Sequence, residues 1–335
     1  MAIAAQPDPN PGALPKDLDR CLVNAYVFLV TGCHTSFRGV QNGNPFFYPE
    51  IMPPIPYAKP YASPADLVTH LIDRNLDISD RADAEQKIAE IGYDRLRIYF
   101  ASRRQHTVIG KPFRSGTTFD DIMRLYALDE ELRALCFRHC SKFELAFRNL
   151  IAEELSSRYG PHPYFDDTIY DSEKSRFSAV KCLSEIFHKS RDPRAKHYFK
   201  KYNPPHLPPI WTLKEFMTFG STNVFFKTLS NQNRLLVSNG FGVTNRNVFE
   251  KWIDALIDFR NVCAHHDRLW NRTFQKEINA YHRKAIPSGP PTKLKAFLEV
   301  LEFLLGARGH RVAIVAEVTT LLRAYPVAQP SELGF

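Results

Sequence analysis

The sequence predicts a mainly α-helical protein. Apolar residues recur at intervals of three and four over several long stretches, whereas strand-like alternation is sparse and hairpin signals are absent. The longest of these patterns follows Thr117 and Thr118 and runs through about 30 residues. It includes Leu125, Leu128, Leu132, Leu135, Cys136, His139, Phe143, Ala146, Phe147 and Leu150. Tyr159 and Gly160 follow the pattern, and glycine can end a helix, so one long central helix is expected.

Shorter helical patterns lie on both sides of the long one. Ser63 and Pro64 are typical of a helix start, because serine caps the first N–H groups and proline fits the first turn. Further helices are expected at 82–91, 172–188, 212–229, 247–269, 293–304 and 312–324. The rest of 161–210, including the basic run 196–201, is polar and proline-rich and is predicted to be largely irregular.

The N-terminal residues are dominated by proline. Four prolines fall within 1–16, and the stretch 44–60 is also proline-rich. Proline fixes φ and removes a backbone donor, so both segments are expected to be extended connectors. Between them, 22–32 is either a short strand or a short helix.

Composition bounds the cellular setting and the kind of partner. Of 335 residues, 44% are hydrophobic and 24% are charged, which is typical of a globular protein. The apolar stretch 21–33 is too short to cross a membrane and lacks the preceding basic cluster of a signal peptide. Six cysteines without a CxxC pair indicate reduced thiols, so a cytoplasmic protein without a membrane partner is expected. The net charge of +8 favours nucleic acid as a partner, although many mildly basic proteins bind none.

A first candidate for RNA contact lies in the stretch 91–104. It places Tyr93, Tyr99 and Phe100 beside four arginines, namely Arg95, Arg97, Arg103 and Arg104. Aromatic rings can stack on bases while arginines bind phosphates. The alternative is an amphipathic core element with a solvated arginine face.

The stretch 252–271 carries the most specific chemistry. Its apolar start gives way to Arg260, Asn261 and His265, which at about 100° per residue share one side of a helix. Arginine offers a planar fork for a phosphate, histidine exchanges protons near neutral pH, and asparagine can orient either neighbour. These groups suffice for RNA cleavage through the 2′-OH without a metal.

The spacing alone is not specific. Arg133 with His139 and Arg191 with His197 repeat it, and Arg133 is expected to be solvated while His139 faces the core. Cysteine and histidine also gather near His265 and near His139, but neither group has CxxC or HExxH spacing. No metal and no cofactor are therefore expected.

Several runs of sequence resemble the Abi-like (abortive infection) family of bacterial phage-defence proteins, within the HEPN superfamily of helical RNA-processing domains. They are KPYASPADLVTHLIDRNL, IGYDRLRIYF, GTTFDDIMRLYALDEELR, FELAFRNLIAEELSSRYG, PPIWTLKEFMTFGS and DFRNVCAHHDRLWN. The resemblance implies a helical bundle of HEPN type at 59–275, with additional elements at 1–58 and 276–335. It also implies that the RNxxxH run, here Arg260, Asn261 and His265, is a ribonuclease motif that pairs with a second copy across a homodimer.

Two further groups match the family. Glu144 and Arg148 have the i,i+4 spacing of an ion pair, and Asn149 follows them; they provide either structural support or substrate contact. The second group is His266, Asp267, Arg268, Trp270 and Asn271. In it, Asp267 is expected to hold a histidine tautomer and Trp270 to close the bundle, unless the group is simply a capped helix end.

These features predict a metal-independent endoribonuclease of a phage-defence or toxin type. A non-cleaving protein that holds a structured or guide-like RNA is the alternative, and an interaction subunit is a third possibility. An antitoxin or a non-coding RNA is a further expected partner.

Overall fold

A computed structural model describes residues 60–202 and 204–335, and these residues are built from helices. They contain twelve α-helices, α2 to α13, five short 3-10 helices and no strand. The predicted mainly α-helical fold is confirmed. The expected connector at 1–16, the element at 22–32 and nearly all of the connector at 44–60 lie outside the described residues. The chain divides into two compact units, Met1–Tyr126 and Ala127–Phe335.

The described part of the first unit contains three short helices and the start of a fourth. They are α2 (Pro64–Ile72), α3 (Arg81–Ile91), α4 (Tyr93–Ser102) and the first turns of α5 (Phe119–Tyr159). Ser63 caps α2 by accepting a hydrogen bond from the backbone N–H of Asp66, whose carboxylate in turn accepts one from the N–H of Ser63. The helices predicted after Ser63 and at 82–91 are confirmed.

The long helix α5 extends over 41 residues and supplies the central face of the second unit. Its buried side includes Leu128, Leu132, Phe143 and Phe147, as the apolar spacing predicts. Phe143 and Phe147 pack against rings from other helices, namely Phe219, Phe226, Phe241 and Phe249. This aromatic cluster joins α5 to the helices that surround it.

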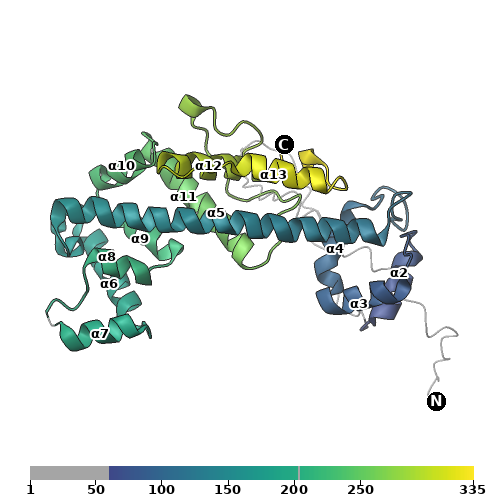
Figure 1. The fold of residues 1–335 in the computed structure, drawn as a ribbon, viewed down its shortest axis with the longest axis horizontal. Helices are drawn as coiled ribbons and strands as arrows, with labels where there is room; N and C mark the ends of the chain where they lie inside the picture. The colour runs from purple at the N-terminus through teal and green to yellow at the C-terminus, as the bar shows by residue number, and fades with distance from the viewer. Residues whose placement is uncertain (1–59, 203) are drawn as a thin grey trace, which may run out of the picture. The chain divides into compact units, whose positions relative to one another are not determined.

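The other helices of the second unit pack around α5 (Figure 1). They are α6 (Glu173–His188), α7 (Pro193–Lys201), α8 (Ile210–Leu213), α9 (Phe219–Thr228), α10 (Asn231–Gly240), α11 (Arg246–Ala264), α12 (Leu294–Ala307) and α13 (Ile314–Ala324). Residues 276–335 pack into the same unit, because Phe297 on α12 contacts Phe259 on α11. The domain boundaries at 58 and 275 stay a prediction.

The structure differs from the predicted elements at four places. Residues 193–201 form α7 instead of a loop, with Asp192 as cap and Pro193 in the first turn. Helix α10 was not predicted, and the expected helix at 212–229 is interrupted before a new cap at Thr218. Finally, α11 ends at Ala264 rather than near 269.

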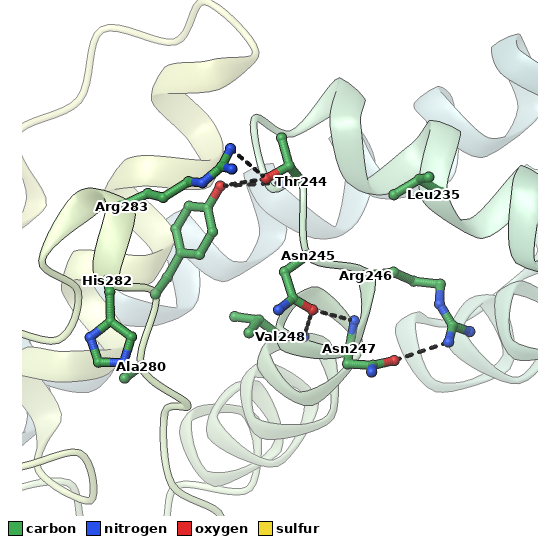
Figure 2. Close-up of a pocket in the computed structure, with 10 residues that line it drawn as sticks. Leu235, Thr244, Asn245, Arg246, Asn247, Val248, Ala280, His282 and Arg283 are labelled. Atoms are coloured by element: carbon green, nitrogen blue, oxygen red, sulfur yellow. Dashed lines mark hydrogen bonds between the residues drawn. The ribbon is translucent and has the colours of Figure 1, made fainter.

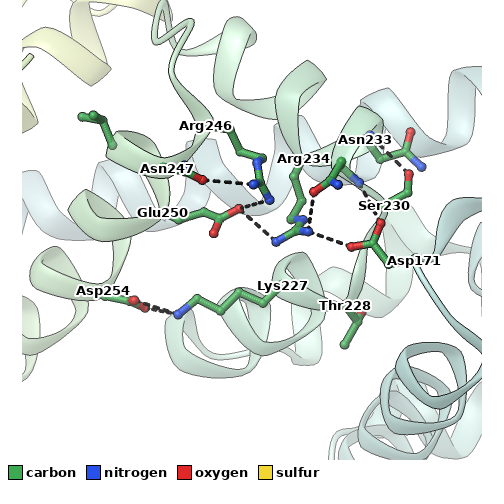
Figure 3. Close-up of polar contacts among 12 residues, drawn as sticks. Asp171, Lys227, Thr228, Ser230, Asn233, Arg234, Arg246, Asn247, Glu250 and Asp254 are labelled. Atoms are coloured by element: carbon green, nitrogen blue, oxygen red, sulfur yellow. Dashed lines mark hydrogen bonds and ion pairs between the residues drawn. The ribbon is translucent and has the colours of Figure 1, made fainter.

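An ion-pair network holds α11 in place (Figure 3). Arg234 on α10 binds Asp171 at 2.7 Å and Glu250 on α11 at 3.0 Å, and Arg246 binds the same Glu250 at 3.1 Å. One turn further along α11, Asp254 binds Lys227 of α9 at 2.6 Å. Helices α9 and α10 therefore hold the first half of α11, whose last turn carries Arg260 and Asn261.

None of the helices in the described ranges is both long enough and apolar enough to cross a lipid bilayer.

Candidate functional site

Arg260 and Asn261 lie in the last turn of α11, and His265 is the residue that ends the helix. The N–H of His266 donates to the carbonyl of Cys263, and the N–H of Asp267 donates to that of Val262. This pair of bonds is a Schellman motif, which closes the helix with one residue in the left-handed region. His266 occupies that position with φ of 59°, although it is not glycine. The chain therefore turns away directly after His265.

Arg260 is fixed by three neighbours and remains partly open to solvent. Its Nη1 donates to the Oδ1 of Asn261 at 3.2 Å, and its Nη2 lies 3.3 Å from the carboxylate of Glu144 on α5. The guanidinium also lies over the ring of Phe137, 5.9 Å from its centroid. The side chain is 27% exposed. Asn261 thus orients Arg260, as the sequence predicts.

Glu144 is a buried carboxylate shared by two arginines. Its side chain is 7% exposed and pairs with Arg148 one turn along α5, as the i,i+4 spacing predicts, and also with Arg260. Two positive charges and one negative charge leave a local excess of one positive charge. The Nε atoms of both arginines are buried without an acceptor among the described residues. Two arginines with an excess of positive charge are suited to binding a phosphate. Asn149, the residue after Arg148, is exposed.

His265 is exposed at the end of α11. Neither its imidazole nor the guanidinium of Arg260 is sealed in the interior, which a role in catalysis on RNA requires. One helix end therefore presents a fixed arginine fork and a solvent-accessible proton carrier.

A buried aspartate anchors the segment that follows His265. Asp129 on α5 is fully buried, and its Oδ1 accepts the backbone N–H groups of Leu269 at 2.9 Å and Trp270 at 2.5 Å. Its Oδ2 accepts a bond from Arg133 at 2.5 Å. The prediction that Arg133 is solvated is wrong, because this residue is 5% exposed and neutralises Asp129. His139 faces the core as predicted, and burial lowers its pKa.

The remaining residues of this segment stabilise the loop. Trp270 is buried and its Nε1 donates to Glu332 at 2.9 Å, so it closes the bundle as predicted. Arg268 donates to the carbonyls of Trp270 and Asn271. The carboxylate of Asp267 lies 4.0 Å from Arg272, and among the described residues this is its ion pair. The structure thus places Asp267 near an arginine, and its role in holding a histidine tautomer stays a prediction.

Three buried thiols lie behind the site, contributed by Cys136 and Cys140 on α5 and Cys263 on α11. The hydrogen bond with Cys263 and burial raise the pKa of Cys136, and burial raises the pKa of Cys140. Neutral thiols do not cancel the positive charge of Arg260. Within the described residues, no three His, Cys, Asp or Glu side chains are grouped to hold a metal ion.

The arginines predicted to contact RNA at 91–104 belong to the first unit. Arg95 donates to the hydroxyl of Tyr126 at 3.3 Å, and Arg97 pairs with Asp94 at 3.1 Å. Arg103 is half-buried. Arg104 is buried, with its guanidinium over Phe113, so it lacks the solvent access that an RNA contact needs. For the other three, RNA contact stays a prediction.

A cavity of about 540 Å³ lies at the opposite end of α11 (Figure 2). There Arg283 donates to Thr244, whose hydroxyl also bonds Tyr281, and this bond lowers the pKa of Tyr281. Asn245 accepts the first N–H groups of α11, at Asn247 and Val248. The backbone N–H groups of Asn247 and Val248 therefore already have an acceptor. None of the predicted site residues lines this cavity.

Fold and site together define a helical protein with two arginines on one buried carboxylate and an exposed histidine at the end of the helix that carries one of them. The family model of the Abi-like proteins matches residues 86–271, which is more than half of the chain. The chain therefore belongs to the Abi-like protein family, and the predicted resemblance is confirmed. Neither the comparison with curated proteins nor that with solved structures gives a match.

Sequence reasoning named candidate residues but missed two of the contacts that hold this region. The pairing of Glu144 with Arg260 and the anchoring of the 269–270 backbone by Asp129 were not predicted. The i,i+4 spacing of Asp129 and Arg133 signals the ion pair between these two residues, but no local pattern signals the contact with the 269–270 backbone.

Proposed function

We propose that this protein is an endoribonuclease of a phage-defence or toxin type that cleaves RNA without using a metal ion. The observation that carries the proposal is the shared carboxylate. Arg148 and Arg260 surround Glu144 with an excess of positive charge, at the same helix end that exposes His265. Membership of the Abi-like family supports the same conclusion.

In the proposed reaction, Arg260 binds the scissile phosphate and His265 transfers a proton. The ribose 2′-oxygen loses its proton to a base and attacks the adjacent phosphorus, and an acid protonates the leaving 5′-oxygen. Arg260 and Arg148 stabilise the negative charge that develops on the phosphorus oxygens. Asn261 holds the guanidinium of Arg260 in register. The products are a 2′,3′-cyclic phosphate and a free 5′-hydroxyl.

The chemistry is tested with a matched pair of substrates. Purified protein is expected to cut an RNA oligonucleotide in the presence of chelator. A second oligonucleotide, identical except for a 2′-deoxyribose at the cleaved position, should stay uncut. Mass spectrometry of the RNA products should show the cyclic phosphate. Cleavage of both substrates, or activity lost only in chelator, would contradict the mechanism. RNA that stays bound and intact would support the alternative of a protein that holds RNA.

We further propose that two copies complete the site, because a two-fold contact gathers more cationic groups around one phosphate than the helix end of one chain supplies. In a two-fold dimer, Arg260 of each chain would act with the imidazole of the other. Mixing Arg260→Ala and His265→Ala proteins then produces dimers with one intact pair. Half of the dimers are mixed and one of their two sites is complete, so about a quarter of the wild-type activity is expected.

The mixing experiment requires subunit exchange, which light scattering and labelled subunits can verify. Recovery of activity after exchange supports a shared site. Exchanged dimers that stay inactive, or a monomeric protein that cleaves RNA, would contradict the shared site while leaving the cleavage chemistry unaffected.

A further inference from the structure

The stretch 189–202, here called the basic segment, concentrates positive charge. It contains six lysines and arginines and one acidic residue, Asp192. All six are exposed: Lys189, Arg191, Arg194, Lys196, Lys200 and Lys201. The net charge of the whole chain is +8, so fourteen residues hold an excess of five positive charges. In Figure 1, α7 lies at the outer edge of the second unit, with α6 between it and α5.

The inner side of the basic segment packs against α6 and the residues around Leu207. Ala195 and Tyr198 are buried, and the hydroxyl of Tyr198 donates to the carbonyl of Leu207 at 2.9 Å. The ring of Phe187 on α6 contacts both Tyr198 and Phe199. These contacts fix α7 on α6, so its outer side is a stable surface.

Four of the six charges on that surface lack an acidic partner. Lys189 pairs with Glu185 and Arg194 with Asp192, whereas Arg191, Lys196, Lys200 and Lys201 have no ion pair among the described residues. Lys196 and Lys200 have i,i+4 spacing, at which like charges destabilise a helix. The helix dipole favours Lys200 and Lys201 in the last turn but disfavours Arg194 and Lys196 in the first turns. A bound polyanion would remove this repulsion.

Two exposed aromatic rings flank these cations. Phe199 is 41% exposed and Tyr202 is 47% exposed, and the ammonium of Lys201 lies over the Tyr202 ring, 5.3 Å from its centroid. Lysines that follow a backbone and rings on which bases stack are the two components of a surface for single strands. Single-stranded RNA would use both the charges and the rings.

The basic segment also contacts the turn that follows α8. The guanidinium of Arg194 lies over the ring of Phe216, 5.1 Å from its centroid. Phe216 also contacts the ring of Phe187 on α6, so this contact helps to hold the segment in place.

We propose that the outer face of α7, with Arg191, Lys196, Lys200, Lys201 and the ring of Tyr202, binds single-stranded RNA. This inference rests on the proposed function for its choice of RNA as the occupant. The face binds phosphates and stacks unpaired bases.

The test measures binding to full-length protein that carries His265→Ala, so that RNA stays intact. The probe is a labelled oligouridylate of about 16 nucleotides, compared with an RNA duplex of the same length. The variant R191Q/K196Q/K200Q/K201Q removes four charges and keeps helix-forming side chains. The control K251Q/K284Q/R311Q/R323Q removes four exposed charges that also lack an ion pair among the described residues, so both proteins have the same net charge.

The first variant is expected to bind the oligouridylate at least about 10-fold more weakly than the control. Between about 50 and 200 mM salt, its slope of log K against log salt should fall by about 3, from four contacts at about 0.7 each. Tyr202→Leu keeps an apolar side chain against Tyr198 and is expected to weaken only single-strand binding, by about 10-fold. Thermal melting verifies that each variant is folded.

Three outcomes would overturn the inference. They are equal weakening in the variant and the control, Tyr202→Leu protein that binds both probes as before, and loss of binding to polyglutamate or anionic vesicles with RNA binding unchanged. The test does not depend on cleavage. A wild-type protein that never cuts RNA but shows the expected binding differences would refute the proposed function and leave this inference standing.

Discussion

His265→Ala is expected to lower the rate of RNA cleavage by about 100- to 10,000-fold, which is the usual contribution of a positioned proton-transfer group. Arg260→Ala is expected to lower it by about 100- to 1000-fold, because the variant loses a fixed donor to the developing charge. Single-turnover rates on one defined oligonucleotide measure both effects. Arg260→Lys should recover little, since a lysine cannot reproduce the planar fork beside Asn261 and Glu144.

Two exposed residues of the same types provide matched controls. His310→Ala and Arg311→Ala remove an exposed histidine and an exposed arginine on the loop before α13, and neither should change the rate. The melting curve of the His265 variant should stay close to wild type, because its imidazole is exposed. The Arg260 variant should still unfold cooperatively, because Arg148 continues to pair with Glu144. If both variants retain wild-type rates, the assignment of the site is wrong.

Asp129→Ala is expected to destabilise the protein by about 3–5 kcal/mol, which is the usual effect of removing one partner of a buried ion pair. The substitution leaves the buried charge of Arg133 unpaired and removes the acceptor of two backbone N–H groups, those of Leu269 and Trp270. The midpoint temperature of thermal unfolding should fall by about 6–20 °C, because each kcal/mol lowers it by about 2–4 °C in a unit of this size.

A second substitution separates the charge from the lost acceptor. Asp129→Ala combined with Arg133→Met removes both charges and is expected to recover part of the stability, since the unpaired cation is gone. Asp120→Ala, an exposed aspartate on the same helix, should cost less than about 1 kcal/mol. An Asp129→Ala protein as stable as wild type would contradict the anchoring role.

Local patterns in the sequence predicted most of the helices. The apolar spacing of α5 and the Ser63 cap of α2 act within one element, and both appear as predicted. Helix α7 was not predicted because its short, highly charged sequence lies among prolines, and its buried residues are defined by contacts with α6. Helix α11 ends early because the backbone of His266 is in the left-handed conformation, and the residue that usually signals this conformation is glycine.

The candidate site shows the same limit. Arg260, Asn261 and His265 are close in the sequence, so a shared role could be predicted from their residue types together with the family resemblance. Glu144 lies on another helix more than a hundred residues earlier, and only the packing of α5 against α11 brings its carboxylate to Arg260. The spacing of apolar residues within one helix does not indicate an ion pair between two helices that are far apart in the sequence.

The distance along the chain between Glu144 and Arg260 also matters during synthesis. When α5 has been translated, Glu144 has one arginine partner, Arg148. The second partner, Arg260, follows more than a hundred codons later. Until α11 has been translated, the nascent polypeptide therefore lacks the second arginine of the proposed site. On the proposed function, only a chain translated beyond α11 becomes a hazard to the transcripts of its own cell.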